Sequence, residues 1–420
     1  MKLYYYDKEQ LSCANKKHIL NMLRVQILYM IQRAGAGHIG SAFSVLPIMY
    51  DLFKEVKDED VIFSSKGHDC AAYYAILQML GKIPFDTLHT FRQQGGSLQG
   101  HPHPSDGYSP FHTGSLGMGL SKAQGLALAD RLAGRNRRIH VIVGDGELQE
   151  GQMSEAIRNT IKHDLLGRIT IHIDANGYQC DDVKVALCPK NCDAVPFLKV
   201  HYTEKGYGGE PLHAGALSAD KYEQIVGELI ADFPLKPVCV EYERRITPLM
   251  PNYLTKEYYS YYLGQYFIDN DKLVVLNADL AKDCGIDTFR EHERFIEFGI
   301  SEQDMVSTAS GLAHGGFLPI VHSFAAFLCR RANEQIYNNC CEGRKIIYIG
   351  AFAGVLPYGP GETHECLDDI ALMKTMPNMI VFNPQTPHEL NSCLYFAIYE
   401  TGKSSYIRIP CIAEVEGARV

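Results

Sequence analysis

The sequence predicts an α/β protein of two domains, each built on a parallel β-sheet flanked by helices. Its 420 residues are enough for two or three domains, each with a core of its own. In both halves, short apolar runs typical of buried strands alternate with segments of helical periodicity, which is the pattern of parallel sheets. The pattern breaks where Pro248 and Pro251 lie close together. We therefore predict domains over residues 1–246 and 247–420.

The first domain begins with helices and continues with alternating strands and helices. Residues 16–33 carry apolar side chains at helical spacing, and the run Arg138-Ile-His-Val-Ile-Val143 is typical of a buried strand. The other predicted elements are a helix over 46–53, a helix that begins near Asp69, a turn at 144–146, a helix that ends near His163 and a strand over 169–173. A strand, turn, helix and strand in this order place both strands in one parallel sheet.

The second domain shows the same alternation. Its predicted strands, separated by segments of helical pattern, cover residues 273–276, 317–321, 345–349, 379–382 and 405–409. These strands predict a second parallel sheet with its own flanking helices.

Composition excludes several classes of function. The net charge of −9 argues against a general nucleic-acid-binding protein, whose surface is normally basic. No run of about 18 apolar residues occurs and the first residues lack a signal-peptide pattern, so we expect no membrane span and a cytoplasmic enzyme. The thirteen cysteines include no CxxC pair and no zinc-finger spacing, so we expect reduced thiols, most of them buried.

Two side chains with oxygen donors follow neighbouring strands of the first domain. Asp145 lies in a Gly144-Asp145-Gly146 turn directly after one strand, and Asn176 follows the next. Open α/β sheets bind ligands at the carboxyl ends of their strands, and small residues let the backbone approach a phosphate closely. A carboxylate and an amide carbonyl are hard ligands suited to Mg²⁺ or Ca²⁺. These donors favour a metal at Asp145 and Asn176 that bridges a diphosphate, with the backbone of the Gly144–Gly146 turn close to the phosphates.

The chain resembles the transketolase family over residues 37–364. Asp145 and Asn176 at this spacing are similar to the family's thiamine diphosphate signature, and the resemblance implies a metal held by Asp145, Asn176 and Tyr178 with the diphosphate at Gly144 and Gly146. Further segments that resemble family motifs, in the family's order, are Gly37 to Ser41, Ser65 to His68, Gly100 to Pro102, Thr113 to Gly119, Gly144 to Gly151, Gly206 to Gly208 with His213, Gly299 to Gln303, His322 to Arg330 and Gly361 to His364. The resemblance implies two thiamine diphosphate-binding-fold domains, the first for the diphosphate and the second for the pyrimidine.

The resemblance also implies roles for individual residues. Glu302, in an apolar enclosure, is expected to hydrogen-bond N1′ of the aminopyrimidine, so that the exocyclic nitrogen of that ring takes the C2 proton. Phe324 and Phe327 are expected to pack on the pyrimidine, with Arg330 alongside. The other implied cofactor contacts are His68 at the diphosphate, Leu116 at the central rings, Gly114 on the aminopyrimidine side and Asp279 at the thiazolium.

Four histidines, His38, His101, His213 and His364, match the family's active-site histidines, which move protons on substrate hydroxyls. In the family, the diphosphate domain of one subunit and the pyrimidine domain of another form each site. The resemblance therefore implies a homodimer with active sites at the subunit interface. It implies transfer of a two-carbon ketol unit from a ketose donor to an aldehyde acceptor.

The chain departs from the family where a sugar phosphate is held. An ungapped local alignment places Asp283, Phe352 and Cys411 at positions of phosphate-binding residues, and Pro360 at an aspartate that reads the donor's C2 hydroxyl. An acid, an apolar ring and a thiol hold a phosphate dianion poorly, so we expect a substrate that is not simply a sugar 5-phosphate. The sequence ends at Val420, so we also expect the family's third, carboxy-terminal domain to be absent.

Two alternatives remain open. Ser301-Glu302-Gln303 and Phe327 to Arg330 also fit a decarboxylating carboligase of the 1-deoxyxylulose 5-phosphate synthase type, whereas Gly100 to Pro102 and Gly361 to His364 favour ketol transfer. The other alternative is a catalytically inactive homologue, which the presence of Asp145, Asn176 and Glu302 together disfavours.

Overall fold

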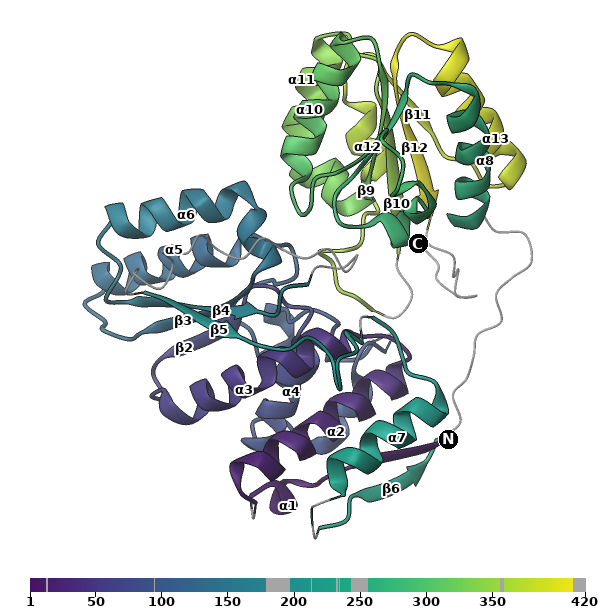
Figure 1. The fold of residues 1–420 in the computed structure, drawn as a ribbon. Helices are drawn as coiled ribbons and strands as arrows, with labels where there is room; N and C mark the ends of the chain where they lie inside the picture. Colours follow the sequence, from purple (N-terminus) through teal and green to yellow (C-terminus); the bar gives the residue numbers. More distant parts are fainter. Residues whose placement is uncertain are drawn as a thin grey trace. The chain divides into compact units, whose positions relative to one another are not determined.

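The computed structural model describes residues 1–12, 14–93, 95–178, 197–212, 214–231, 233, 235–242, 256–355 and 359–410. These residues form two compact units (Figure 1). The first contains the described residues up to 242 together with 359–361, and the second contains 256–355 and 362–410.

The first unit is built on a four-stranded parallel sheet. Its strands, in spatial order, are β2 (Val61–Ser64), β3 (Ile139–Gly144), β4 (Ile169–Ala175) and β5 (Leu198–Tyr202). Helices α5 (Gly119–Leu132) and α6 (Gly151–Lys162) pack on one face against Val141 and Val143, and α3 (Ile39–Glu55) packs on the other (Figure 1). The carboxyl ends of β3 and β4 therefore lie side by side, as the predicted parallel sheet requires.

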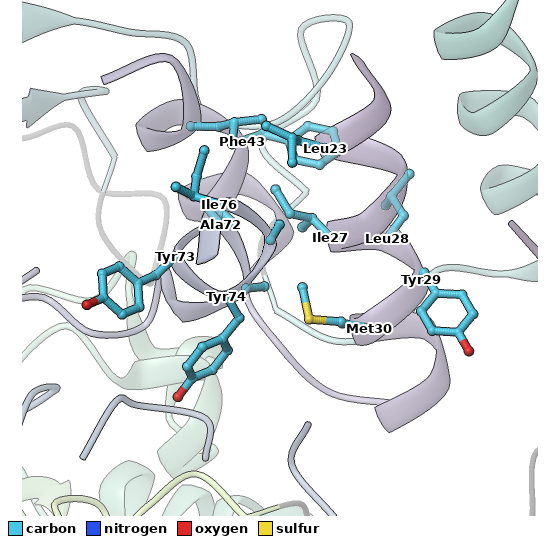
Figure 2. Close-up of a cluster of buried hydrophobic side chains, with 14 of the residues drawn as sticks. Leu23, Ile27, Leu28, Tyr29, Met30, Phe43, Ala72, Tyr73, Tyr74 and Ile76 are labelled. Carbon is cyan, nitrogen blue, oxygen red and sulfur yellow. The ribbon is translucent and has the colours of Figure 1, made fainter. Parts of the chain in front are cut away.

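A helical layer supports this sheet. Helices α2 (Lys16–Ala34), α3 and α4 (Cys70–Met79) share a core in which Leu23 and Ile27 meet Phe43 and Ile76 (Figure 2). Helix α3 begins seven residues before the predicted helix over 46–53. Almost every side chain of α3 from Ile39 to Leu46 is buried, so this stretch lacks the one-sided pattern that sequence periodicity detects.

Smaller elements complete the first unit. They are α1 (Lys8–Ser12), α7 (Ala219–Ile230) and an antiparallel pair formed by β1 (Lys2–Tyr5) and β6 (Val238–Glu241). The antiparallel pair was not predicted, because its two short strands are more than 200 residues apart and neither carries a distinct pattern.

The second unit has a six-stranded parallel sheet, which confirms the predicted fold class. In spatial order its strands are β11 (Met379–Phe382), β12 (Ser404–Pro410), β10 (Ile347–Ala353), β9 (Leu318–Phe324), β7 (Leu273–Asn277) and β8 (Phe295–Glu297). One face carries α8 (Lys256–Asp269) and α13 (Pro387–Tyr395), and the other carries α10 (Glu302–His314), α11 (Asn333–Cys341) and α12 (Asp369–Lys374). Within the described ranges, no helix is long and apolar enough to cross a membrane.

Three histidines form a hydrogen-bonded row across the first sheet. Nδ1 of His140 on β3 lies 3.2 Å from Nε2 of His172 on β4, and Nδ1 of His172 lies 3.1 Å from Nε2 of His201 on β5. Each contact joins an N–H to a lone pair, which suits neutral imidazoles. Burial, together with the neighbouring His140, His201 and Lys199, lowers the pKa of His172 to about 3. Burial likewise lowers the pKa of His140 and of His201. The nearby carboxylate of Asp60 partly offsets this shift at His140, and those of Asp174 and Asp51 partly offset it at His201.

Acid should destabilise the protein through this row. In the unfolded chain a histidine takes up a proton near pH 6.5, whereas folded His172 stays neutral, so its contribution to stability is complete above pH 6.5 and is lost as the pH falls toward 3. At pH 5 one histidine that is held neutral costs about 2 kcal/mol.

The test is urea unfolding of His172→Leu, followed by circular dichroism at pH 7.5 and pH 5. The loss of unfolding free energy between these two pH values should be about 2 kcal/mol smaller than in the wild type. His163→Leu, at an exposed position, is the matched control and should leave the loss unchanged. Equal losses in the wild type and His172→Leu would contradict the assignment.

Candidate functional site

The Gly144-Asp145-Gly146 turn holds a buried carboxylate at the carboxyl end of β3. Asp145 is 3% exposed; its Oδ1 accepts the Gly146 N–H at 2.9 Å and its Oδ2 accepts the Gly177 N–H at 2.6 Å. Burial raises the pKa of Asp145, and the two N–H groups act against that shift. Each carboxylate oxygen has a second lone pair. Asp145 can therefore bind a cation while it ties together the loops that follow β3 and β4.

Asn176 is held with its amide in one orientation. Its Nδ2 lies 3.4 Å from both Ser44 Oγ and Asp174 Oδ2, and its Oδ1 accepts the Tyr178 N–H at 3.1 Å. A reversed amide would set its carbonyl against a carboxylate and its NH₂ against an N–H. The predicted metal ligands Asp145, Asn176 and Tyr178 thus lie on two adjoining loops, and the backbone N–H of Tyr178 donates to Asn176.

The charges at this edge of the sheet suit a divalent cation. The carboxylates of Asp69 and Asp174 are fully buried, Asp145 is nearly so, and the buried ammonium of Lys66 is 2.5 Å from Asp174 and 3.8 Å from Asp69. A cation would stabilise the ionised form of Asp145, whose pKa burial raises, and the carboxylate and amide donors are the hard oxygens that Mg²⁺ and Ca²⁺ prefer. The residues present therefore fit the metal that the sequence pattern implies.

Three of the predicted histidines lie together in the first unit. Ring centroids are 5.4 Å apart for His38 and His68, and 6.3 Å apart for His38 and His101. Nδ1 of His101 lies 2.5 Å from the Pro360 carbonyl oxygen, which requires an N–H at Nδ1 and leaves Nε2 as an acceptor. Burial lowers the pKa of His101 to about 4, so the ring is neutral at pH 7. The fourth histidine predicted for this unit, His213, lies outside the described residues.

The loop of Gly114 and Leu116 lies against this histidine group. Gly114 has φ 92°, and a Cβ on it would lie 2.5 Å from Cδ2 of His101, so only glycine fits there. Leu116 is half-buried. Glu147, which the sequence analysis did not assign, supports the loop, since its Oε1 accepts the Gly117 N–H at 2.8 Å and the Ser65 hydroxyl. A single glutamate in a helical turn carries no sequence signal of such a role.

In the second unit, Glu302 is buried at the start of α10 and is paired with an arginine. It is 2% exposed, and its two oxygens lie 3.2 and 3.1 Å from Nη1 of Arg331. From the sequence we expected an apolar enclosure around Glu302, and we expected Arg330 beside Phe324 and Phe327. Instead, the Arg331 guanidinium lies 5.2 Å from the Phe327 ring centroid, while Arg330 is exposed and bonds Asp368 at 2.6 Å. Phe327–Arg331 is a π-helical turn, which is wider than an α-helical one, so the residue four positions on rather than three returns to the side of Phe327.

The predicted aromatic residues of this unit form one cluster. Ring centroids are 5.6 Å apart for Phe324 and Phe327, 4.7 Å for Phe324 and Phe352, and 5.1 Å for Phe327 and His364. Phe352 has φ 52°, unusual for an aromatic residue, and lies where the pairing of β10 with β12 is irregular. The cluster offers ring faces and the His364 imidazole next to the Glu302–Arg331 pair.

The remaining predicted residues of the second domain are Asp279, Asp283 and Cys411. Asp279 follows β7 with φ 59°, a conformation that Asp tolerates better than most residues, and its N–H donates to Glu297 Oε1 at 2.9 Å. Asp283 is half-buried in the short helix α9 (Ala281–Cys284). Cys411 lies outside the described residues.

Comparisons with known proteins identify both units. The transketolase thiamine diphosphate binding domain matches residues 15–194, and the transketolase pyrimidine binding domain matches residues 254–412. Transketolase-like protein 2 from Mus musculus is 28% identical over 460 residues, which cover 91% of this chain and 72% of that protein. The 1-deoxy-D-xylulose-5-phosphate synthase of Halothermothrix orenii is 25% identical, with 93% of this chain and 71% of the synthase covered. Among solved structures, transketolase from Campylobacter jejuni matches with a TM-score of 0.47 and 20% identity, covering 93% of this chain and 78% of that one.

Proposed function

The chain belongs to the transketolase family, and on this premise we propose that it transfers a two-carbon ketol unit from a ketose donor to an aldehyde acceptor, with thiamine diphosphate and Mg²⁺ or Ca²⁺ as cofactors. The observation that carries the proposal is the pair of oriented oxygen donors, Asp145 and Asn176, on adjoining loops of the first unit. Thiamine diphosphate, when bound, supplies the nucleophilic carbon that this reaction needs.

The chain's own residues are assigned to binding the cofactor and to contacting the substrate. Asp145 and Asn176 hold the cation, with His68 near the diphosphate. Glu302 hydrogen-bonds the aminopyrimidine ring, on which Phe324 and Phe327 pack. His101 is neutral at pH 7 and has an acceptor at Nε2, so it can orient a substrate hydroxyl by accepting its hydrogen bond. We further propose that the active form is a homodimer in which two chains contribute to each site.

The cofactor assignment predicts metal-dependent binding. Purified protein should bind thiamine diphosphate in the presence of Mg²⁺ and should release it when excess chelator is added. Asp145→Ala should bind the cofactor at least tenfold more weakly, or about 1.4 kcal/mol, because the one carboxylate among the proposed cation ligands is lost. Asp58→Ala, which removes an exposed carboxylate from the same unit, should bind as the wild type does. Isothermal titration calorimetry measures all three, and equal binding with and without chelator would contradict the metal assignment.

The substrate is proposed to differ from a simple sugar 5-phosphate. Phe352, at a position where the alignment expects a phosphate-binding residue, packs on Phe324 and offers no donor. A half-buried carboxylate at Asp283 repels a phosphate dianion. We therefore expect kcat/KM for unphosphorylated ketoses such as xylulose to be within tenfold of that for xylulose 5-phosphate. A preference for the phosphorylated donor of tenfold or more would contradict this, and CO₂ release from pyruvate would point instead to the decarboxylating alternative.

A further inference from the structure

Lys66 is a charged side chain without contact to solvent at the edge of the first sheet. It follows β2 and is 1% exposed. Its Nζ lies 2.5 Å from Asp174 Oδ2 and 3.0 Å from Ser41 Oγ, and 3.8 Å from Asp69 Oδ2. A buried ammonium is costly unless it is paired and hydrogen-bonded, so these three partners determine where it sits.

Asp174 connects Lys66 to the loop that contains Asn176, a proposed metal ligand. Its Oδ2 accepts from Lys66, from the Ser44 hydroxyl at 2.7 Å and from the Asn176 amide at 3.4 Å, and its Oδ1 accepts from the Thr203 hydroxyl at 2.5 Å. Ser44 Oγ is the second acceptor for the same amide, at 3.4 Å. Asp174 and Ser44 thus hold the NH₂ end of Asn176, and this leaves the Oδ1 end for other partners.

We propose that Lys66 is a positioning residue that, through Asp174 and Ser44, keeps the side-chain oxygen of Asn176 available for the cation that binds with the cofactor. The inference rests on the proposed function, since it presumes that cation. Lys66 offsets the cost of burying the Asp174 carboxylate, and only a carboxylate and a hydroxyl in these places favour one orientation of the amide. Without the ammonium, the buried Asp174 carboxylate is stabilised only by its remaining hydrogen-bond donors, one of which is the Asn176 amide. Asn176 then shifts toward Asp174, and its Oδ1 leaves the position that suits the cation.

The experiment measures the affinity for Mg²⁺ rather than activity. MgCl₂ is titrated by calorimetry into the full-length protein at a saturating concentration of thiamine diphosphate. Lys66→Met keeps the apolar stem and removes the charge, and it should raise the Kd for Mg²⁺ at least tenfold. Ser44→Ala removes one acceptor of the Asn176 amide without changing a charge, and it should raise the Kd about threefold or more. Ser44→Ala also keeps the test valid if Lys66→Met does not fold.

The matched control is Arg137→Met. Arg137 pairs with Asp130, a carboxylate that is as buried as Asp174, with Nε at 2.5 Å from Asp130 Oδ2, but it lies just before the amino end of β3. This variant should lower the melting temperature and leave the Kd for Mg²⁺ within twofold of the wild type. A purely structural Lys66 would behave in the same way.

The outcomes separate the two proposals. Wild-type protein that binds Mg²⁺ with the cofactor, together with unchanged Kd values in Lys66→Met and Ser44→Ala, overturns the role of Lys66 and leaves the proposed function in place. Wild-type protein that binds no thiamine diphosphate at any Mg²⁺ concentration overturns the proposed function, and the role of Lys66 with it. Weaker Mg²⁺ binding in both variants but not in Arg137→Met supports the positioning role.

Discussion

Glu302→Gln is expected to slow exchange of the C2 proton of bound thiamine diphosphate by about 10²- to 10⁴-fold, the range of a general acid–base contribution. Glu302 is buried at the start of α10, and its carboxylate is held in place by Arg331. Glutamine has the same size and still accepts a hydrogen bond, so the fold and much of the cofactor affinity should persist, although the variant should be less stable because Arg331 loses its counter-charge. What is lost is the group that can share a proton with the aminopyrimidine nitrogen.

The exchange rate is measured by NMR on protein that is mixed with deuterated water and quenched with acid. Asp304→Asn is the matched control, because it removes a carboxylate from an exposed position in the same helical turn. The control should exchange within twofold of the wild-type rate. If Glu302→Gln also exchanges at the wild-type rate, Glu302 is not the activating group.

Arg331→Met should lower the free energy of unfolding by about 3–5 kcal/mol, because it leaves the buried Glu302 carboxylate without its partner. Arg331 is 8% exposed and Glu302 3% exposed in this pair, so water cannot replace the lost charge. The double variant Glu302→Gln/Arg331→Met should recover part of the loss, since it removes both charges.

Arg330→Met, one position earlier, provides the contrast. Arg330 pairs with Asp368, but the two side chains are 45% and 51% exposed, and a pair of this kind contributes about 0–1 kcal/mol. Urea unfolding of the four proteins measures the difference. Similar losses for Arg330→Met and Arg331→Met would show that the Glu302 pair is not desolvated as the structure describes.

The sequence alone was sufficient for features that are local in the chain. Where apolar runs predicted strands, the observed strands overlap them, and Met379–Phe382 matches at both ends. Strands β2 and β5, at the two edges of the first sheet, were not predicted. The very short β8 was not predicted, since three residues carry no period. The Gly144-Asp145-Gly146 turn and Asn176 were identified because strand ends in a parallel sheet occupy a common edge, which makes their neighbourhood a consequence of strand order.

Only the tertiary structure decided which buried charges are partners. Lys66 meets Asp174 across 108 residues, His101 meets the Pro360 carbonyl across 259, and Glu302 pairs with Arg331 rather than lying in an apolar enclosure. Residue type and spacing reveal that a charge is present but not which group offsets its desolvation, because that depends on side-chain contacts between segments far apart in sequence. The family could therefore be predicted from short motifs. The network around the proposed cation ligands required the folded chain, since a buried charge is stable only where the surrounding segments bring its counter-charge.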